Sequence, residues 1–276
     1  MLSIAVFYAL WLMRTRTLAG IFLLTASTLL FEINLASQFV ISTGHHFASV
    51  VVSTALLGIG AAGVFVHLFP SFALRFSPAS ISFALGLAYP AVMAAAGQVA
   101  FDPVRLDWDI REILNLFLYY PLFALPFFFS ALVVTGVMKK QFRHSGKIYF
   151  ADMAGAAIGS LLFFLVSRSD GLPIAVCSLL AAAVLVFNGG YAAWKRVAMA
   201  AMIAVIAAVL YPRFELPISP YKELALFHNY PRTEVMESSR GPAGRIDVIS
   251  SPFIRWAPGL NPLYGDPVPS GYCRCF

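Results

Sequence analysis

The sequence has few charged residues and few cysteines, and each shortage excludes a class of protein. Only 12% of its 276 residues are charged and 60% are hydrophobic, whereas about 25% charged residues are typical of a soluble globular domain. Its three cysteines are Cys177, inside an apolar run, and Cys273 and Cys275, near the last residue. They provide no disulfide framework. We therefore expect a polytopic membrane protein, with the lipid bilayer as its main partner.

The first residues lack the order of features found in a secretory leader. Residues 1–13 are apolar, but the positive charges Arg14 and Arg16 follow this run, and no small-residue cleavage site comes after them. A leader has its charges first and its cleavage site last. We therefore interpret residues 1–17 as a hydrophobic lead-in, residues 18–211 as a transmembrane bundle and residues 212–276 as a separate region.

Seven apolar stretches are candidates to cross the roughly 30 Å of hydrocarbon in a bilayer as helices, at about 1.5 Å per residue. The predicted spans are residues 18–42, 47–69, 81–100, 113–138, 147–168, 172–187 and 197–211. The last two are short and rich in alanine. The predicted fold class is an all-α polytopic membrane helical bundle of about seven spans, with a short C-terminal tail that contains a β-hairpin.

The fifth predicted span, residues 147–168, carries a carboxylate and two glycines on one helix face. Asp152, Gly155 and Gly159 have the spacing i, i+3 and i+7, so they align along a helix, and the glycines let another backbone approach closely. This pattern predicts a seam between two helices. Asp152 is either a functional carboxylate beside that seam or an interfacial cap near the end of the span, where a charge costs little.

A second carboxylate, Glu32, falls near the middle of the first predicted span. An ionisable side chain at that depth is by default a candidate functional site, and it needs a partner or a water-filled cavity. The alternative is a protonated or hydrogen-bonded Glu32 that holds its helix to a neighbour. Glu32 and Asp152 together are the candidate intramembrane polar site.

The second span contains Gly58, Gly60 and Gly63 in the spacing of the dinucleotide-binding pattern G-x-G-x-x-G. That pattern needs a preceding strand and an acidic residue about 20 positions on, and both are missing here. The three glycines are therefore interpreted as helix-packing positions.

His45 and His46 have no further metal ligands nearby in the sequence. The sequence predicts no metal site, no bound cofactor and no catalytic residue.

The basic residues of the predicted loops fall on one side of the membrane if all seven stretches cross it. They are Arg14, Arg16, Arg75, the run at 139–147, Lys195 and Arg196. The acidic loop 101–112 and Asp170 fall on the other side, together with the tail. Because Lys and Arg are concentrated in cytoplasmic loops, membrane topology accounts for the formal charge of +6, and no nucleic-acid partner is predicted.

The composition changes from Pro212 onward. Ten of the 17 prolines lie in residues 212–276, which excludes long helices there. Residues 233–237 and 245–251 are short β-like runs, with a turn at residues 241–244 between them. A single hairpin is not stable alone in water, and residues 271–276 show no patterning. The tail is therefore interpreted as the beginning of a soluble domain.

Residues 30–33, 46–48, 53–63 and 149–159 form a combination that resembles the membrane half of bacterial membrane-bound spermidine synthase-like proteins. In the tail, residues 219–222, 244–248 and 255–260 resemble the segment that joins this membrane half to an aminopropyltransferase-like domain. The resemblance covers about residues 18–270.

The resemblance implies a multi-pass protein of the inner (plasma) membrane, followed by a small β region and a Rossmann-like transferase domain that binds decarboxylated S-adenosylmethionine. No glycine-rich loop and no acidic catalytic pair occur after Asp266, so no transferase residue is carried over. Residues 212–276 are expected to be the start of a truncated spermidine synthase-like soluble domain. A downstream or separate transferase domain is the implied partner.

The expected function is that of the membrane-embedded part of a spermidine synthase-like protein, without transferase activity as an isolated chain. An alternative is a transporter-like bundle that moves a small cation or amine past Glu32 and Asp152, although the two halves of the sequence show no inverted repeat. A structural membrane scaffold is the third possibility.

Overall fold

The chain first forms a helical bundle and then a small β-sheet. The structure, a computed structural model, describes residues 2–44, 47–73, 75–99, 101, 103–169, 171–188, 191–211, 218–220, 222, 225, 232–250 and 272–275. The helices are α1 (Leu2–Ser42), α2 (Ala48–Leu68), α3 (Pro70–Ala73), α4 (Pro78–Ala96), α5 (Ile110–Lys140), α6 (Ser145–Val166), α7 (Leu172–Asn188) and α8 (Ala193–Leu210). The 3-10 turns are η2 (Pro103–Arg105) and η3 (Phe142–His144), and the strands are β1 (Glu234–Gly241), β2 (Gly244–Ser250) and β3 (Tyr272–Cys275).

Six helices of the described chain are long and apolar enough to cross a membrane: α1 from Thr15 onward, α2, α4, α5, α6 together with η3, and α8. Helix α7 is apolar over Leu172–Leu185 but shorter. The prediction of an all-α bundle of about seven spans is therefore confirmed. Helix α1 also continues back to Leu2 through the predicted lead-in, because no proline or glycine precedes Gly20 to interrupt it.

Local sequence sets where two of the long helices begin and end. The hydroxyl of Ser77 accepts a hydrogen bond from the backbone N–H of Ser80 at 3.1 Å, and proline occupies the first turn of α4, as is typical of helix N-termini. Asp109 caps α5 through the N–H of Arg111 at 3.0 Å. The last turn of α5 contains Lys139 and Lys140, whose charges favour a helix C-terminus.

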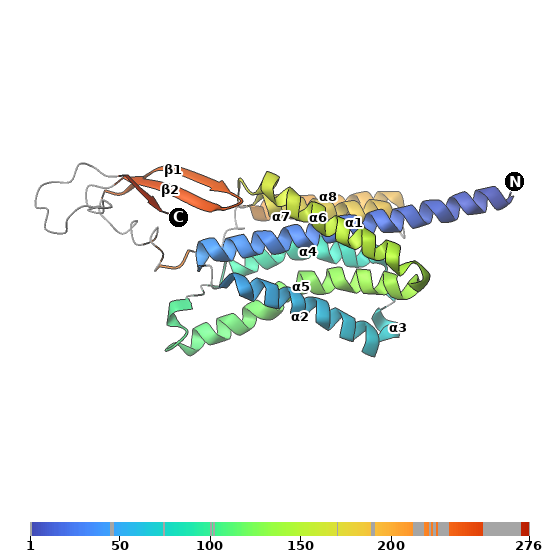
Figure 1. Ribbon diagram of the computed structural model, residues 1–276, viewed down its shortest axis with the longest axis horizontal. Coiled ribbons are helices and arrows are strands. Elements are labelled where there is room, and N and C mark those ends of the chain that lie inside the picture. The colour runs from blue at the N-terminus through green and yellow to red at the C-terminus, as the bar shows by residue number, and fades with distance from the viewer. Residues whose placement is uncertain are drawn as a thin grey trace, which may run out of the picture.

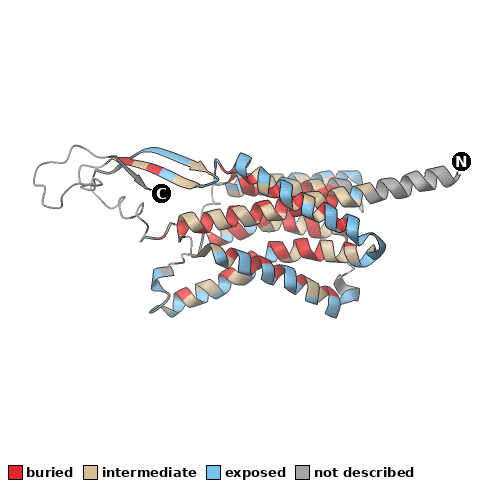
Figure 2. Ribbon diagram, in the orientation of Figure 1, coloured by how far each residue is buried: buried red, intermediate tan, exposed pale blue. Residues whose placement is uncertain are grey.

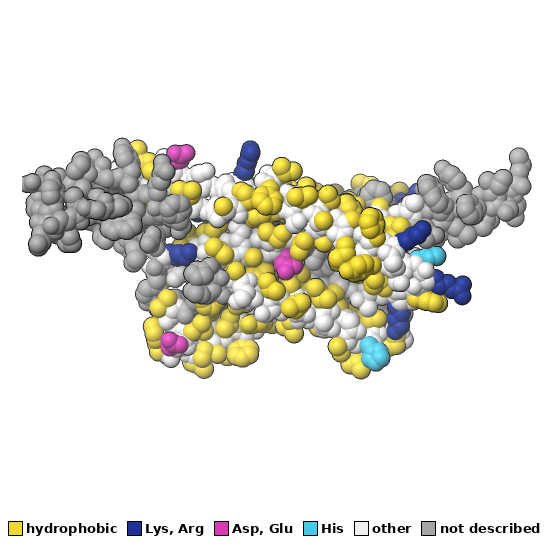
Figure 3. Space-filling model, viewed as in Figure 1, with side chains coloured by type: hydrophobic (Ala, Val, Ile, Leu, Met, Phe, Trp, Pro, Cys, Tyr) yellow, Lys and Arg dark blue, Asp and Glu magenta, His cyan; other side chains and the backbone are white. Residues whose placement is uncertain are grey.

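Helix α1 is the central helix of the bundle. It packs against α6 and α7 and also contacts α2 and α5, and its side chains Leu24, Phe31 and Leu35 are completely buried. Buried residues lie between the helices, and exposed ones face outward (Figure 2). The outward surface is largely hydrophobic (Figure 3) and includes Phe117 and Leu165. Such a surface is typical of helices that face lipid.

The sheet extends from the end of the bundle opposite the N-terminus (Figure 1). Strands β1 and β2 form an antiparallel hairpin, and β3 pairs with β2 to give the order β1-β2-β3. Gly244 after the turn has a φ of +140°, which favours glycine. The predicted hairpin is confirmed. The third strand, β3, lies in residues where the sequence shows no β pattern. It is held by pairing with β2, and such pairing cannot be predicted from the sequence of β3 alone.

The bundle has a basic end and an end that carries the sheet. The loops after α2, α5 and α7 lie at the basic end beside the N-terminus (Figure 1), where Lys, Arg and His side chains gather (Figure 3). The loops after α1, α4 and α6 lie at the other end, as the charge pattern predicted. Asp102, Asp170, the pair at 45–46 and the run at 255–260 lie outside the described residues.

Candidate functional site

Asp152, Gly155 and Gly159 lie along the contact between α6 and α1. A Cβ atom at Gly155 would meet Thr25 of α1, and one at Gly159 would meet the backbone of Ala26. The hydroxyl of Thr25 also donates to the backbone oxygen of Asp152 at 3.1 Å. The two glycines therefore let α6 lie directly on the backbone of α1, which is how small residues bring membrane helices together.

The three glycines of α2 have different surroundings. A Cβ atom at Gly58 would meet Ala124 and Phe127 of α5, so Gly58 permits close packing of α2 on α5. A Cβ atom at Gly60 or Gly63 would have no neighbour within 4 Å. The prediction that these last two glycines pack helices is wrong for contacts within this chain, because the buried face of α2 runs through other positions.

The two predicted carboxylates do not form a pair. Thr25 lies at the level of Asp152, and Glu32 follows Thr25 by seven residues, which is about 10 Å of helix rise. Both acids are half-buried, and neither has a salt-bridge partner within the described part of the chain. The bundle therefore contains two separate acidic positions near one helix contact.

A buried cluster of hydroxyl groups, which the sequence analysis missed, lies one turn along α1 from Glu32. The hydroxyl of Thr28 donates to that of Ser130 at 2.7 Å and lies 3.3 Å from the phenol oxygen of Tyr89. The hydroxyl of Ser27 is 3.0 Å from the same phenol oxygen. The cluster thus joins α1, α4 and α5. The one available signal was the four-residue spacing of Thr28 and Glu32, which puts them on one helix face.

Asn34 of α1 and Ser178 of α7 are completely buried, at 0% exposure. Neither polar atom of the Asn34 amide, nor the hydroxyl of Ser178, has a hydrogen-bond partner among the described residues. A buried polar group left in this state costs about 1–3 kcal/mol, so such groups mark places where a water molecule or a ligand group is favourable.

The described residues provide no group of three or more His, Cys, Asp or Glu side chains that could hold a metal ion. A structural metal site needs about four such ligands at coordination distance. The polar groups described in the bundle are therefore considered for polar binding and for helix packing.

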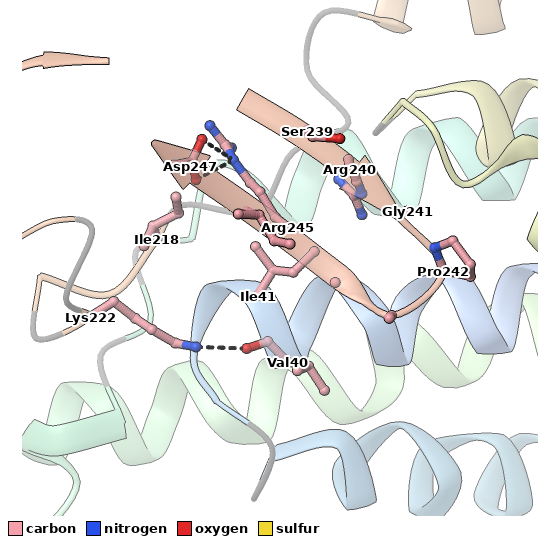
Figure 4. Close-up of a pocket in the computed structure, with 13 residues that line it drawn as sticks. Val40, Ile41, Ile218, Lys222, Ser239, Arg240, Gly241, Pro242, Arg245 and Asp247 are labelled. Atoms are coloured by element: carbon pink, nitrogen blue, oxygen red, sulfur yellow. Dashed lines mark hydrogen bonds and ion pairs between the residues drawn. The ribbon is translucent and has the colours of Figure 1, made fainter. Parts of the chain in front are cut away.

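The joint between the bundle and the sheet is a further polar region. The N–H of Ser219 donates to the backbone oxygen of Ser42 at 2.8 Å, and the Nζ of Lys222 donates to the backbone oxygen of Val40 at 2.9 Å. These carbonyls belong to the last turn of α1, where the helix itself supplies no donor. A cavity of about 520 Å³ lies between this end of α1 and the β1–β2 hairpin (Figure 4).

The hairpin places three charged side chains beside this cavity. The Nε of Arg245 lies 2.9 Å from a carboxylate oxygen of Asp247, which is 2% exposed. Strand pairing sets Arg240 of β1 opposite Arg245 of β2. Burial and, to a smaller extent, the charge of Arg245 together lower the pKa of Arg240 to about 10. Sequence reasoning missed Arg240, because only the strand register brings it to Arg245.

The lengths and apolar surfaces of the helices are those of an integral membrane protein that crosses the bilayer several times. The polar features described above are the two carboxylates, the hydroxyl cluster, the buried Asn34 and Ser178, and the joint with the sheet. Comparisons of the chain with known protein families, with curated proteins and with solved structures find no match.

Proposed function

We propose that this membrane protein is the membrane-embedded part of a spermidine synthase-like protein, and that its bundle holds the sheet at the membrane surface as the attachment point for a transferase domain. The position of the tail residues that carry the resemblance supports this proposal. Ser219 and Lys222 bond to the end of α1, and the run Gly244–Asp247 lines the facing wall of the cavity. The tail segments that resemble a connection between two domains therefore lie together at the end of α1, where hydrogen bonds hold them to the helix.

The side chains at this joint support a role in holding the sheet at the membrane surface, and not a role in transferring a group to an amine. Transfer of a group to an amine uses a general base that can reach the amine proton. Among the described residues that line the cavity, the acid is Asp247, and it is almost fully buried and bound to Arg245. A carboxylate held in this way stabilises the hairpin and is not positioned to accept a proton from a substrate.

The purified chain in lipid vesicles is expected to form no spermidine from putrescine and decarboxylated S-adenosylmethionine. The measurement is mass spectrometry of the polyamines after incubation, with a soluble spermidine synthase added to identical vesicles as the positive control. Spermidine formation above the level of empty vesicles would overturn the assignment of a holding role to this chain.

A second candidate function is the passage of a cationic amine through the bundle. The observation that favours it is a series of polar groups inside the spans: Asp152 beside Thr25, the cluster at Thr28, and Glu32 one turn further along α1. Carboxylates within membrane-spanning segments commonly mark pathways of ions or substrates. This second candidate requires that the chain transports an amine measurably, whereas the first candidate, attachment of a transferase domain, does not.

If the bundle moves an amine, Glu32→Gln is expected to reduce uptake of labelled putrescine into proteoliposomes by ~10-fold or more, because one charge-assisted contact of about 1.5–3 kcal/mol is lost. The matched control is Glu237→Gln, the same chemical change at an exposed residue of β1. Uptake that survives Glu32→Gln would show that this carboxylate is not the amine site.

A further inference from the structure

A groove lies between α1 and the first turns of α6, at the basic end of the bundle (Figure 1). Its volume is about 560 Å³, which is within the usual range of ligand sites, about 300–1,000 Å³. Leu18 and Phe22 line it from α1, and Phe150 and Ala154 line it from α6. Lys147 is the charged residue of the described lining. The groove is therefore apolar along its walls, with one cation.

The groove arises from the way α6 packs on α1. The two helices touch at Gly155 and Gly159, where an added Cβ atom would meet the backbone of α1. In the turn of α6 before Gly155, the lining residues Ala151 and Ala154 are too small to fill the space beside α1. Phe150 also lines the groove and is 75% exposed. The groove is therefore open to the outer surface of the bundle, which faces lipid.

The groove also lies at the level where a lipid headgroup meets its acyl chains. The parts of the two helices that are able to span a membrane begin at Thr15 and Phe142, and the groove lies in the turns that follow. The exposed Lys147 comes first along α6, and the apolar lining residues of that helix follow it into the bundle. The cation therefore lies nearer to the polar surface of the bilayer, and the apolar walls lie nearer to its hydrocarbon.

The positive charge at this end is not offset by acids in the same segments. Residues 1–17, 69–77, 139–147 and 188–196 contain Lys and Arg but no Asp or Glu. The acid nearest to Lys147 along the chain is Asp152, which is about 140° away around the helix and does not line the groove. Lys147 has no salt bridge within the described part of the chain. Basic residues in such a position attract anionic lipids.

We propose that this groove binds an anionic phospholipid, with one acyl chain along the apolar walls and the phosphate beside the ammonium group of Lys147. The two parts of the ligand match the two parts of the groove in chemistry and in depth. A zwitterionic phospholipid fits the apolar walls equally well, so the ammonium group is what selects a lipid with net negative charge. The proposal does not depend on the function proposed above.

The test is native mass spectrometry of the purified chain in detergent, titrated with dioleoylphosphatidylglycerol, dioleoylphosphatidylcholine and glycerol 3-phosphate. The first molecule of phosphatidylglycerol is expected to bind each chain more tightly than phosphatidylcholine, which has the same acyl chains. Glycerol 3-phosphate, which has the phosphate without acyl chains, is expected not to displace it. Equal affinities for the two lipids, or displacement by glycerol 3-phosphate at a similar concentration, would overturn the proposal.

Lys147→Gln is expected to weaken the first binding of phosphatidylglycerol ~5-fold, the effect of one basic residue near a membrane surface. Lys147→Arg is expected to keep the binding, because the charge remains. The matched control is Lys195→Gln, which removes another exposed lysine at the same end of the bundle but outside the groove. An equal loss in the two glutamine variants would show that the lipid responds to the general charge of this end, and would overturn the site.

Ala154→Leu is expected to weaken the binding of both lipids, because the larger side chain takes up space that the acyl chain needs. The matched control is Ala157→Leu, the same change at an exposed position of α6 outside the groove, which is expected to leave binding unchanged. Unchanged binding in Ala154→Leu would overturn the placement of the acyl chain.

Thermal unfolding without lipid shows whether a loss of binding is a loss of folding. Lys147 lies in the first turn of α6, where a positive charge is unfavourable. Lys147→Gln is therefore expected to unfold at the same temperature as the parent chain or higher. Weaker lipid binding by a variant of unchanged stability is then an effect on the site itself.

Discussion

Gly159→Ala is expected to destabilise the bundle by about 2 kcal/mol, the scale of overpacking a tightly fitted contact. The added methyl group would meet the oxygen and Cα of Ala26 in α1. These are backbone atoms, so no flexible side chain can move aside, and α6 must shift away from the central helix. The measurement is the midpoint of unfolding in a denaturing detergent titration, followed by circular dichroism.

Gly60→Ala is the matched control, because it makes the same substitution inside a helix of the same bundle. Its methyl group would have no neighbour within 4 Å, and alanine favours a helix over glycine by up to about 1 kcal/mol. Gly60→Ala should therefore leave stability unchanged or raise it. Equal effects of the two substitutions would show that α6 does not lie on α1 as closely as described.

Asp247→Asn is expected to loosen the hairpin and to speed tryptic cleavage after Arg240 and Arg245 by ~30-fold, which corresponds to about 2 kcal/mol of local stability. The change removes the charge that offsets Arg245 and leaves two arginines opposite each other across the strands. Loss of one partner of a fully buried ion pair costs more, about 3–5 kcal/mol, but Arg245 is 27% exposed and water compensates part of the loss. The measurement is the rate of appearance of the two fragments from the native chain.

Two further variants distinguish an effect of the Asp247 charge from a general loss of hairpin structure. In the double variant Asp247→Asn with Arg240→Gln, the remaining arginine is no longer opposed by a like charge. Because this variant has no tryptic site at residue 240, only cleavage after Arg245 is compared, and its rate should return part of the way to that of the parent chain. Glu237→Gln, which changes an exposed acid of β1, should cleave like the parent chain. No recovery in the double variant would mean that Asp247 acts through packing and not through its charge.

Positions on the contact between α1 and α6 could be predicted because helix periodicity alone determines which residues of one helix share a face. Asp152, Gly155 and Gly159 were placed together by their spacing, and the structure shows both glycines against α1. The same reasoning failed for Gly60 and Gly63, since a glycine spacing does not say which face of α2 meets a neighbour. The buried face of α2 passes through Gly58 and leaves those two residues outside the contact.

The strand register is a second case in which local pattern was insufficient. Residues 245–251 were predicted as a β-like run, but the position of Arg240 opposite Arg245 depends on the pairing of β1 with β2. The cluster of Thr28, Ser130 and Tyr89 likewise joins three helices that are separated by long stretches of chain. Hydrogen bonds of this kind depend on helix rotation and depth, which no short window of sequence specifies.

The amino-acid sequence by itself determined that the chain is a membrane bundle with a basic end. Long apolar runs have to form helices in lipid to satisfy their backbone groups, and the loop charges then orient them. The tertiary structure alone decided that α1 is the central helix, that Glu32 and Asp152 stand apart, and that a cavity lies between the hairpin and the end of α1. These features arise from contacts between distant segments, where side-chain shape and strand register select one arrangement among many with the same hydrophobic pattern.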